Sequence, residues 1–154
     1  MKGKTFHDLL KDKFPFKPTK SQEKCFKAIS EFLTNSKKNK ILLIKGYAGT
    51  GKTTVIGHLV KYLSLVKKKS ILLAPTGRAA KVLSSYAGNF SYTIHKKIYF
   101  TQSNTEGSEI KFSLKENKHT NTVFIVDESS MIGDERKENK FFENGSLLND
   151  LLYF

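Results

Sequence analysis

Residues 41–53 read ILLIKGYAGTGKT, and the expected fold follows mainly from this stretch. Its first five residues are a short, mostly aliphatic run of the kind that forms a buried strand, so we expect a strand over Ile41–Lys45. The next six residues contain three glycines, which is typical of a tight turn. From Lys52 to about Val66 the apolar residues recur at helical spacing. The stretch therefore predicts a strand, a turn and a helix in succession, which is the first part of a βαβ unit.

Residues 46–53 also match the P-loop pattern G-x-x-x-x-G-K-[ST]. Glycines let the backbone curl so that its N–H groups point at phosphate oxygens, and the start of the following helix adds its positive dipole end. Lys52 would reach the β- and γ-phosphates as a catalytic group, and the Thr53 hydroxyl would coordinate Mg²⁺. A glycine-rich turn with an exposed lysine is the alternative interpretation. The candidate ATP-binding residues in and after the loop are Gly46, Tyr47, Ala48, Gly49, Thr50, Gly51, Lys52, Thr53 and Thr54.

A second candidate element lies at residues 123–128, which read VFIVDE. Four consecutive aliphatic or aromatic residues predict a buried strand, and two carboxylates stand at its carboxyl end. A P-loop enzyme needs a metal-binding carboxylate in such a place. Asp127 would hold Mg²⁺, and Glu128 would orient and deprotonate the attacking water. An adjacent Asp-Glu pair at a strand end can also be no more than a solvated cap.

The rest of the chain continues the alternation of strands and helices. Periodic apolar residues predict helices over about 6–14, from Thr19 to Asn35, from Ala79 to about Gly88, and from Leu147 onward. Two further buried strands are expected at Ser70–Ala74 and Thr122–Val126. Strands separated by helices predict an α/β fold with a mostly parallel sheet flanked by helices.

The expected organisation is one domain over residues 19–154, after an N-terminal extension over residues 1–18. Polar residues 101–121 interrupt the pattern and are interpreted as an insertion. Within it only Ile110, Phe112 and Leu114 alternate like a short edge strand. The polar loop over residues 133–145 has no assignable role.

The composition of the 154 residues, with 38% hydrophobic residues, is that of a single domain of ordinary core-forming capacity. Cys25 is the only cysteine, which excludes an internal disulfide and a cysteine-built zinc site. The longest apolar runs are far shorter than the roughly 20 residues that a membrane span needs. The N-terminal residues contain no apolar stretch of the kind found in a secretory signal. We therefore expect a cytoplasmic protein with no membrane partner.

The net charge of +13 is unevenly distributed along the chain. Residues 46–99 carry nine basic and no acidic side chains, and no Asp or Glu occurs between Glu31 and Glu106. A long interval of one sign favours a polyanionic partner such as nucleic acid. Compositional drift toward lysine is an equally good explanation of the excess.

Five elements, in order along the chain, resemble the RecD-like branch of superfamily 1 DNA helicases, and more closely their first RecA-like motor domain. They are a Gln motif at Gln22, the P-loop at residues 46–53, motif Ia at residues 74–80 (APTGRAA), a Thr-x-His element at residues 93–95, and motif II at residues 127–131 (DESSM). The resemblance implies a RecA-like P-loop fold that uses ATP and Mg²⁺. It also implies translocation 5′ to 3′ on single-stranded DNA, duplex unwinding, and a place in DNA repair or recombination.

Site residues carried over by this resemblance lie outside the P-loop. Gln22 would recognise the adenine edge, because a side-chain amide both donates and accepts hydrogen bonds. Its alternative role, as half of a capping box with Thr19, competes for the same amide. The resemblance implies contacts with the DNA strand for Thr76, Arg78, Thr93 and His95. Without the resemblance, His95 would be interpreted as an ordinary surface histidine.

The chain also departs from the pattern of this helicase family. A second RecA-like domain, which provides arginine fingers in the family, is missing, and so is the strand expected after motif II. Since an arginine finger contributes on the order of 10³–10⁵ in rate, we expect weak ATP hydrolysis by this polypeptide alone. The C-terminus of the first motor domain is expected to be incomplete. Two alternatives stay open: another P-loop ATPase or kinase, and a non-catalytic, ATP-dependent nucleic-acid-binding module.

Overall fold

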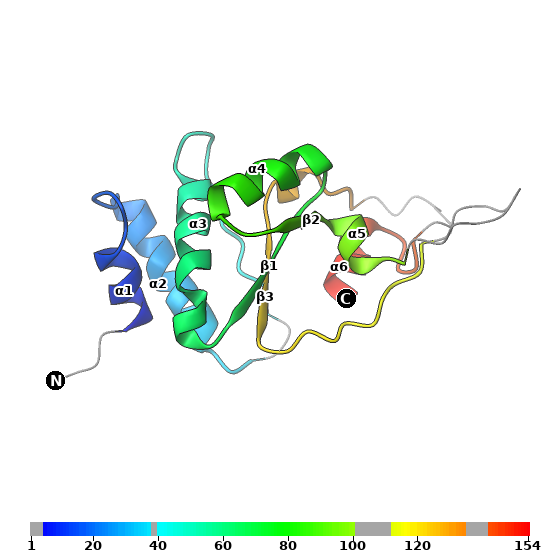
Figure 1. Ribbon diagram of the computed structural model, residues 1–154, viewed down its shortest axis with the longest axis horizontal. Coiled ribbons are helices and arrows are strands. Elements are labelled where there is room, and N and C mark those ends of the chain that lie inside the picture. Colours follow the sequence, from blue (N-terminus) through cyan, green and yellow to red (C-terminus); the bar gives the residue numbers. More distant parts are fainter. Residues whose placement is uncertain (1–4, 38–39, 101–111, 135–141) are drawn as a thin grey trace, which may run out of the picture. The chain divides into compact units, whose positions relative to one another are not determined.

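The computed structural model describes residues 5–37, 40–100, 112–134 and 142–154 (Figure 1). The chain divides into two compact units, residues 1–67 and 68–154, and each is described by itself. The first unit is helical. Its elements are α1 (Phe6–Asp12), α2 (Lys20–Thr34), α3 (Lys52–Tyr62) and a 3₁₀ turn, η1 (Leu63–Val66).

Helix α2 begins where the sequence predicts. The Thr19 side chain accepts a hydrogen bond from the backbone N–H of Gln22, and the Gln22 side chain accepts one from the backbone N–H of Thr19. This reciprocal pair is a capping box, which satisfies two backbone donors that a helix start leaves unpaired. The predicted capping box is therefore confirmed.

Aromatic rings form the core of the first unit. The ring of Phe26, which is fully buried, lies 5.1 Å from that of Phe14, centroid to centroid, and Phe14 lies 5.0 Å from the ring of His58. The His58 Nε2 atom is 2.8 Å from the carbonyl oxygen of Leu10. Helices α1, α2 and α3 are thus joined through a single cluster that includes one buried imidazole.

The predicted strand over Ile41–Lys45 is wrong. This segment has no regular secondary structure, and Ile41 and Leu43 are 71% and 62% exposed. A strand is held by hydrogen bonds to a neighbouring strand, and none of the strands among the described residues pairs with this segment. Apolar composition alone therefore does not form a strand here.

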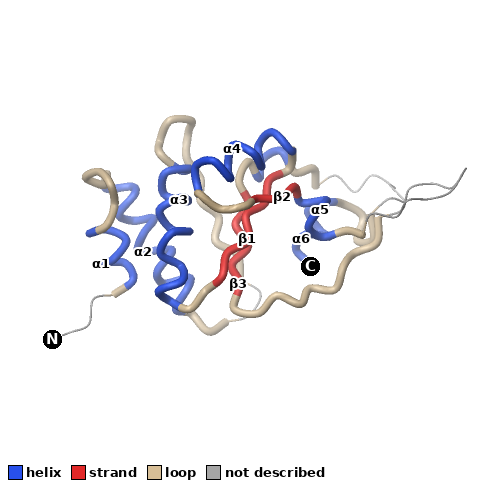
Figure 2. Tube along the Cα trace, viewed as in Figure 1, coloured by secondary structure: helices blue, strands red, loops and turns tan. Residues whose placement is uncertain are grey.

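The second unit is an α/β unit built on a parallel sheet (Figure 2). Its elements are β1 (Lys69–Ala74), α4 (Gly77–Ala87), β2 (Ser91–Thr93), α5 (Ile94–Ile98), β3 (Thr122–Val126), a 3₁₀ turn η2 (Ser129–Met131) and α6 (Leu147–Tyr153). The sheet has three strands in the order β2-β1-β3, and β1 is parallel to both neighbours. The predicted fold class, α/β with a parallel sheet flanked by helices, is confirmed.

The two faces of the sheet have different coverings. Helix α4 packs against β1 and β2, and the Ser91 hydroxyl donates a hydrogen bond to the carbonyl of Ala80 on this helix. On the other face Leu73, Ile94, Ile98 and Tyr99 form a buried cluster, against which α6 also packs. Because side chains alternate along a strand, neighbouring residues of β1 are buried on opposite faces.

A buried polar contact joins this cluster to α6. Tyr99 donates a hydrogen bond of 2.6 Å from its hydroxyl to Asp150, which is fully buried. The other carboxylate oxygen of Asp150 accepts from the backbone N–H and the side-chain amide of Asn144, at 2.7 and 2.8 Å. Burial and this carboxylate raise the pKa of the Tyr99 hydroxyl, so it stays a donor. No sequence pattern around Asp150 indicates that this carboxylate is buried.

Other predicted elements have mixed outcomes. The helix expected to end near Gly88 does so, and the strand at Thr122–Val126 and the helix from Leu147 are present. Strand β2 and helix α5 were not predicted as elements. Leu114 makes one antiparallel bridge with Tyr99, whereas residues 101–111 and 135–141 lie outside the described residues. Within the described ranges, every helix is too short or too polar to cross a membrane.

Candidate functional site

The P-loop depends on two glycines with left-handed backbone conformations. Gly49 and Gly51 have φ angles of +75° and +84°, a region that side chains with a Cβ rarely occupy. Helix α3 starts directly afterwards, at Lys52. The N-terminal backbone N–H groups of a helix have no intrahelical partner and carry a partial positive charge. This is the arrangement expected for binding a phosphate group.

The loop is held closed by contacts of its own. The Thr50 hydroxyl donates a 2.8 Å hydrogen bond to the carbonyl of Tyr47. A Cβ atom at Gly46 would lie 2.8 Å from that same hydroxyl oxygen, so the first glycine allows a close approach. The Tyr47 side chain is 89% exposed and contributes nothing to a core. The conformation therefore comes from glycines and local hydrogen bonds rather than from packing.

Lys52 spans the loop. Its Nζ donates to the carbonyls of Gly46 and Tyr47, at 2.7 and 2.9 Å. The ammonium is therefore held beside the loop backbone, where a phosphate oxygen could exchange for a carbonyl as its acceptor. Thr53 is half-buried and Thr54 is exposed in the first turn of α3. A triphosphate fits this loop because its oxygens can accept from the backbone N–H groups at the helix start and from the lysine ammonium.

Gln22 lies against the P-loop. Its Nε2 donates a 3.4 Å hydrogen bond to the carbonyl of Thr50, while its Oε1 serves the capping box. The same Nε2 lies 2.8 Å from the position of a Cβ at Gly51. Gln22 thus connects the start of α2 to the loop, a contact between residues 28 positions apart that periodicity does not reveal. Its proposed contact with adenine would have to share this amide.

Three candidate residues of the second unit follow adjacent strands at the same edge of the sheet. Asp127 comes directly after β3, Thr93 is the last residue of β2, and Thr76 follows β1 after one residue. The strands are parallel, with Ala74 opposite Thr93 and Leu73 opposite Val126. Carboxyl ends of parallel strands form the usual ligand-binding edge of an open α/β sheet.

Asp127 and Glu128 form a sharp turn at this edge. The Asp127 N–H donates to the carbonyl of Leu73 at 3.0 Å, which fixes its backbone to β1. Its carboxylate accepts a 2.9 Å bond from the N–H of Glu128. Glu128 has φ +53°, which is uncommon for a residue other than glycine, and its side chain is exposed. Strained backbone of this kind is often found at functional sites.

Thr76 and Thr93 have structural roles of their own. Each is the N-cap of a helix, and its hydroxyl accepts from a backbone N–H, that of Ala79 for Thr76 and that of Lys96 for Thr93. Arg78 is exposed in the first turn of α4. The hydroxyls remain able to donate to a phosphate, since a capping threonine uses only a lone pair.

His95 lies among aromatic rings. Its ring centroid is 5.5 Å from that of Phe112 and 5.7 Å from that of Tyr99. Burial lowers the pKa of His95, which favours the neutral imidazole. The residue is half-buried, and its contacts are those of a packing residue at the border of the second core.

The candidate residues divide between the two units. Gln22 and the P-loop residues belong to the first, and Thr76, Arg78, Thr93, His95, Asp127 and Glu128 belong to the second. Within the described ranges, His, Cys, Asp and Glu side chains do not gather in threes to hold a metal.

A P-loop that opens a helix, together with a parallel sheet that ends in an Asp-Glu pair, defines a P-loop NTPase-type α/β domain. Residues 29–145 match the family model described as an AAA domain, and the chain belongs to this family.

Relatives include two uncharacterised proteins. One, from Methanocaldococcus jannaschii, is 32% identical over 73% of this chain and 10% of its own length. The other, from Acanthamoeba polyphaga mimivirus, is 33% identical over 68% of this chain and 25% of its own length. The multifunctional conjugation protein TraI of Escherichia coli is 29% identical over 62% of this chain and 5% of its own length. The chain thus spans a quarter or less of each relative, and no solved structure matches it significantly.

Proposed function

We propose that the chain is the ATP-binding motor domain of an ATP-dependent DNA helicase that moves 5′ to 3′ on single-stranded DNA. The observation that carries the proposal is the shared edge of the sheet, where Thr76, Thr93 and Asp127 follow three adjacent strands. A motor must couple a hydrolytic group to strand-contacting groups. Residues at neighbouring strand ends provide that coupling through a rigid sheet.

The candidate residues would have separate roles in hydrolysis. Lys52 would exchange its carbonyl partners for β- and γ-phosphate oxygens, and Thr53 and Asp127 would be the residues that hold Mg²⁺. When bound, Mg²⁺ neutralises charge on the phosphates. Glu128 accepts the proton of the water that attacks the γ-phosphorus, and the bond to the β-phosphate oxygen breaks. Gln22 contributes to adenine recognition through the amide that lies at the P-loop.

Strand binding would use the second unit. Arg78 has an exposed guanidinium that can donate two parallel hydrogen bonds to one phosphate. The hydroxyls of Thr76 and Thr93 add weaker contacts. Such contacts read no base sequence, as a translocating motor requires. His95 would contact the strand as well, because its neutral ring can still donate one hydrogen bond while it packs against Phe112.

The comparisons support the coarser part of this proposal. AAA-type P-loop domains generally bind ATP with Mg²⁺, and TraI is named for conjugation, a process of DNA transfer. Polarity, unwinding, and the DNA repair and recombination roles come only from the resemblance. A second motor domain that supplies arginines, in the same polypeptide or a partner, is part of the proposal because of their large effect on phosphoryl transfer.

The test is ATP turnover with and without single-stranded DNA, measured with the second motor domain present. We expect stimulation by the strand in the natural chain, loss of turnover in Glu128→Gln by about 10²–10⁴-fold, and loss of stimulation alone in Arg78→Ala. Turnover that responds to Arg78→Ala without DNA would favour another P-loop ATPase or kinase. Strand binding without turnover in any assembly would favour a non-catalytic binding module.

A further inference from the structure

A cavity of about 360 Å³ opens on the second unit, away from the residues discussed so far. Its lower wall is formed by the first residues of β1 and β3, where Lys69 stands opposite Thr122. Thr76, Thr93 and Asp127 instead follow the carboxyl ends of the strands. The cavity therefore lies toward the other end of the sheet.

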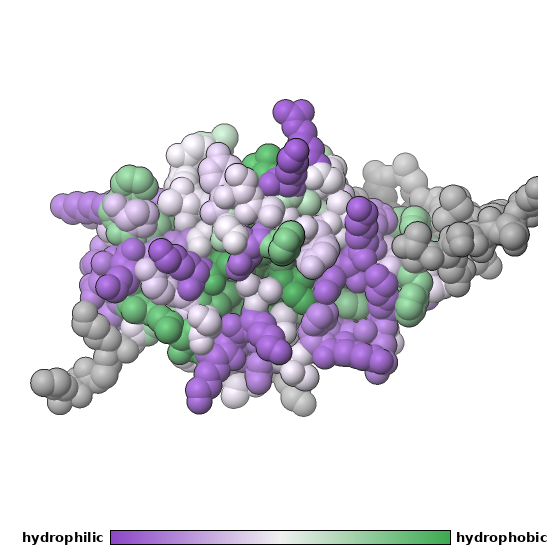
Figure 3. Space-filling model, in the orientation of Figure 1, coloured by the Kyte–Doolittle hydropathy of each residue, from purple (hydrophilic) through white to green (hydrophobic). Residues whose placement is uncertain are grey.

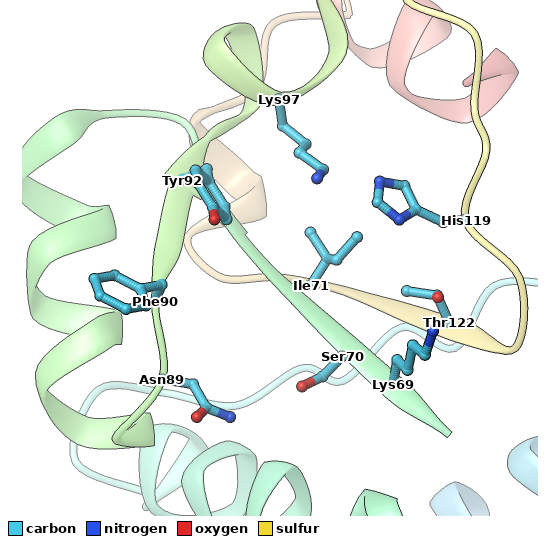
Figure 4. A pocket seen from close by; sticks show the side chains of 9 residues that line it. All are labelled: Lys69, Ser70, Ile71, Asn89, Phe90, Tyr92, Lys97, His119 and Thr122. Carbon is cyan, nitrogen blue, oxygen red and sulfur yellow. The ribbon is translucent and has the colours of Figure 1, made fainter. Parts of the chain in front are cut away.

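The cavity also lies on the sheet face that α4 does not cover. Ser91 contacts α4, so Tyr92, the next residue of β2, points to the opposite face. Ile71 is on that face too, because it packs against the cluster around Leu73. Figure 4 shows Tyr92 and Phe90 on one side of the opening and His119 and Thr122 on the other, with Ile71 between them.

Among the residues that the structure describes, basic groups line the cavity and no carboxylate does. Lys69, Lys97 and His119 all border it. Burial lowers the pKa of His119, and the charges of Lys97 and Lys69, which line the same cavity, lower it further. In Figure 4 the Lys97 ammonium and the His119 ring approach the same space. Hydrophilic residues cover much of the face shown in Figure 3, so polarity alone does not mark a binding site. What marks this site is that Lys69, Lys97 and His119 line one cavity.

Two exposed aromatic rings border the same space. Phe90 is 86% exposed and Tyr92 is 45% exposed. The Lys97 Nζ lies 5.3 Å from the centre of the Tyr92 ring, so a cation is already held beside an aromatic face. Phe90 has no comparable contact among the described residues.

We propose that this cavity binds one nucleotide unit of a single-stranded nucleic acid, with the base on the exposed Phe90 and Tyr92 rings and the phosphate between Lys69 and Lys97. Stacking on an aromatic ring together with neutralisation of phosphate is how proteins bind single strands without reading sequence. Asn89, beside Phe90, adds an amide that can bind a base edge or a sugar. The site is a second strand-binding surface, separate from the one in the proposed function, and it does not require ATP hydrolysis.

The test measures the affinity of the purified chain for a fluorescent oligothymidylate of roughly a dozen nucleotides by anisotropy. Phe90→Ala removes a stacking ring, and we expect affinity to fall about tenfold. Lys97→Glu reverses one charge, and we expect weaker binding and a salt slope that is smaller by about 0.7 for each phosphate that the protein no longer neutralises. Both substitutions are at positions whose side chains lie outside the buried core.

Two variants serve as matched controls. Tyr86→Ala removes an aromatic ring that is 67% exposed on α4, and Lys24→Glu makes the same charge change on the exposed side of α2. We expect both to bind the strand like the natural chain. Thermal melting of each variant shows that a change in binding is not a loss of fold. Equal affinities for Phe90→Ala and Tyr86→Ala, and for Lys97→Glu and Lys24→Glu, would overturn the proposal.

Two further comparisons are needed. One distinguishes a nucleic-acid strand from a free mononucleotide as the ligand, and the other distinguishes failure of the cavity proposal from failure of the motor proposal. A free mononucleotide should compete only weakly with the fluorescent oligonucleotide. If it binds as tightly as the oligonucleotide, the proposal that the ligand is a strand is wrong. Failure of the motor proposal would appear as absent ATP turnover and an Arg78→Ala variant with normal strand binding. Phe90→Ala would still weaken binding in that case, so the outcomes are distinguishable.

Discussion

The close approach of Gln22 to Gly51 predicts that the two left-handed glycines of the P-loop differ in their tolerance of alanine. At Gly49 a Cβ has no atom within 4 Å, whereas at Gly51 it meets the Gln22 Nε2 at 2.8 Å. Both alanines incur a left-handed backbone cost of about 1–2 kcal/mol. Both also stiffen the unfolded chain, which offsets about 0.4–1 kcal/mol. Gly49→Ala should therefore destabilise by roughly 1 kcal/mol or less.

Gly51→Ala should cost more because the Gln22 amide must move. It would then lose the bond to the Thr50 carbonyl and strain the capping box, which together contribute about 1–2 kcal/mol. The total is about 2–3 kcal/mol, or roughly 1 M or more in the urea midpoint at an ordinary slope.

Equilibrium urea unfolding of both variants measures this difference. A Gln22→Ala background provides the control, because Gly51→Ala should then cost no more than Gly49→Ala. Equal destabilisation of the two single variants, or a difference that persists without the Gln22 side chain, would show that Gln22 does not cause the extra cost at Gly51.

Three other predictions concern the cores. Asp150→Ala should destabilise the fold by about 2–4 kcal/mol in urea unfolding, since it leaves the buried Tyr99 hydroxyl unpaired, and Tyr99→Phe in the same background should recover part of that loss. Burial lowers the pKa of His58, so as the pH falls this imidazole is protonated in the unfolded chain before it is protonated in the folded chain. The stabilisation from a neutral His58 should therefore be fully present above about pH 6.5 and be lost as the pH falls through that value toward the pKa of the folded state. His58→Gln should reduce the dependence of the free energy of unfolding on pH, and the dependence due to other histidines should remain. Burial raises the pKa of the Cys25 thiol, so alkylation should be slower than for a free cysteine at pH 7.5 and match it only after unfolding; equal rates in the folded and unfolded chain would contradict this.

Local signals predicted the helices well. The capping box at Thr19 and the helix end at Gly88 are determined by nearby residues, and both form as expected. The first helix is present too, although it ends at Asp12 rather than near residue 14. The predicted strand over Ile41–Lys45 is wrong because a strand needs a partner, which composition does not supply. The short elements β2 and α5 were missed because only eight residues carry them, too few for periodicity.

The candidate site shows the same division. Lys52 and the left-handed glycines lie where the P-loop pattern predicts, because that pattern records a backbone conformation. Contacts between distant residues were not predictable, such as that of Gln22 with Thr50 or the hydrogen bond between Tyr99 and Asp150. The predicted contacts of Gln22 with adenine and of His95 with DNA stay predictions. The Gln22 amide already bonds to Thr19 and Thr50, and the His95 ring packs among aromatic rings.

Equilibrium binding of a fluorescent ATP analogue with Mg²⁺ tests, without requiring turnover, whether the P-loop binds the phosphates of ATP through Lys52. Loss of a charge-assisted contact predicts that Lys52→Ala weakens binding about 10- to 100-fold. Lys61→Ala, which removes an exposed lysine from the same helix, should leave affinity unchanged. No measurable binding by the natural chain, or equal affinities for the two variants, would contradict the account.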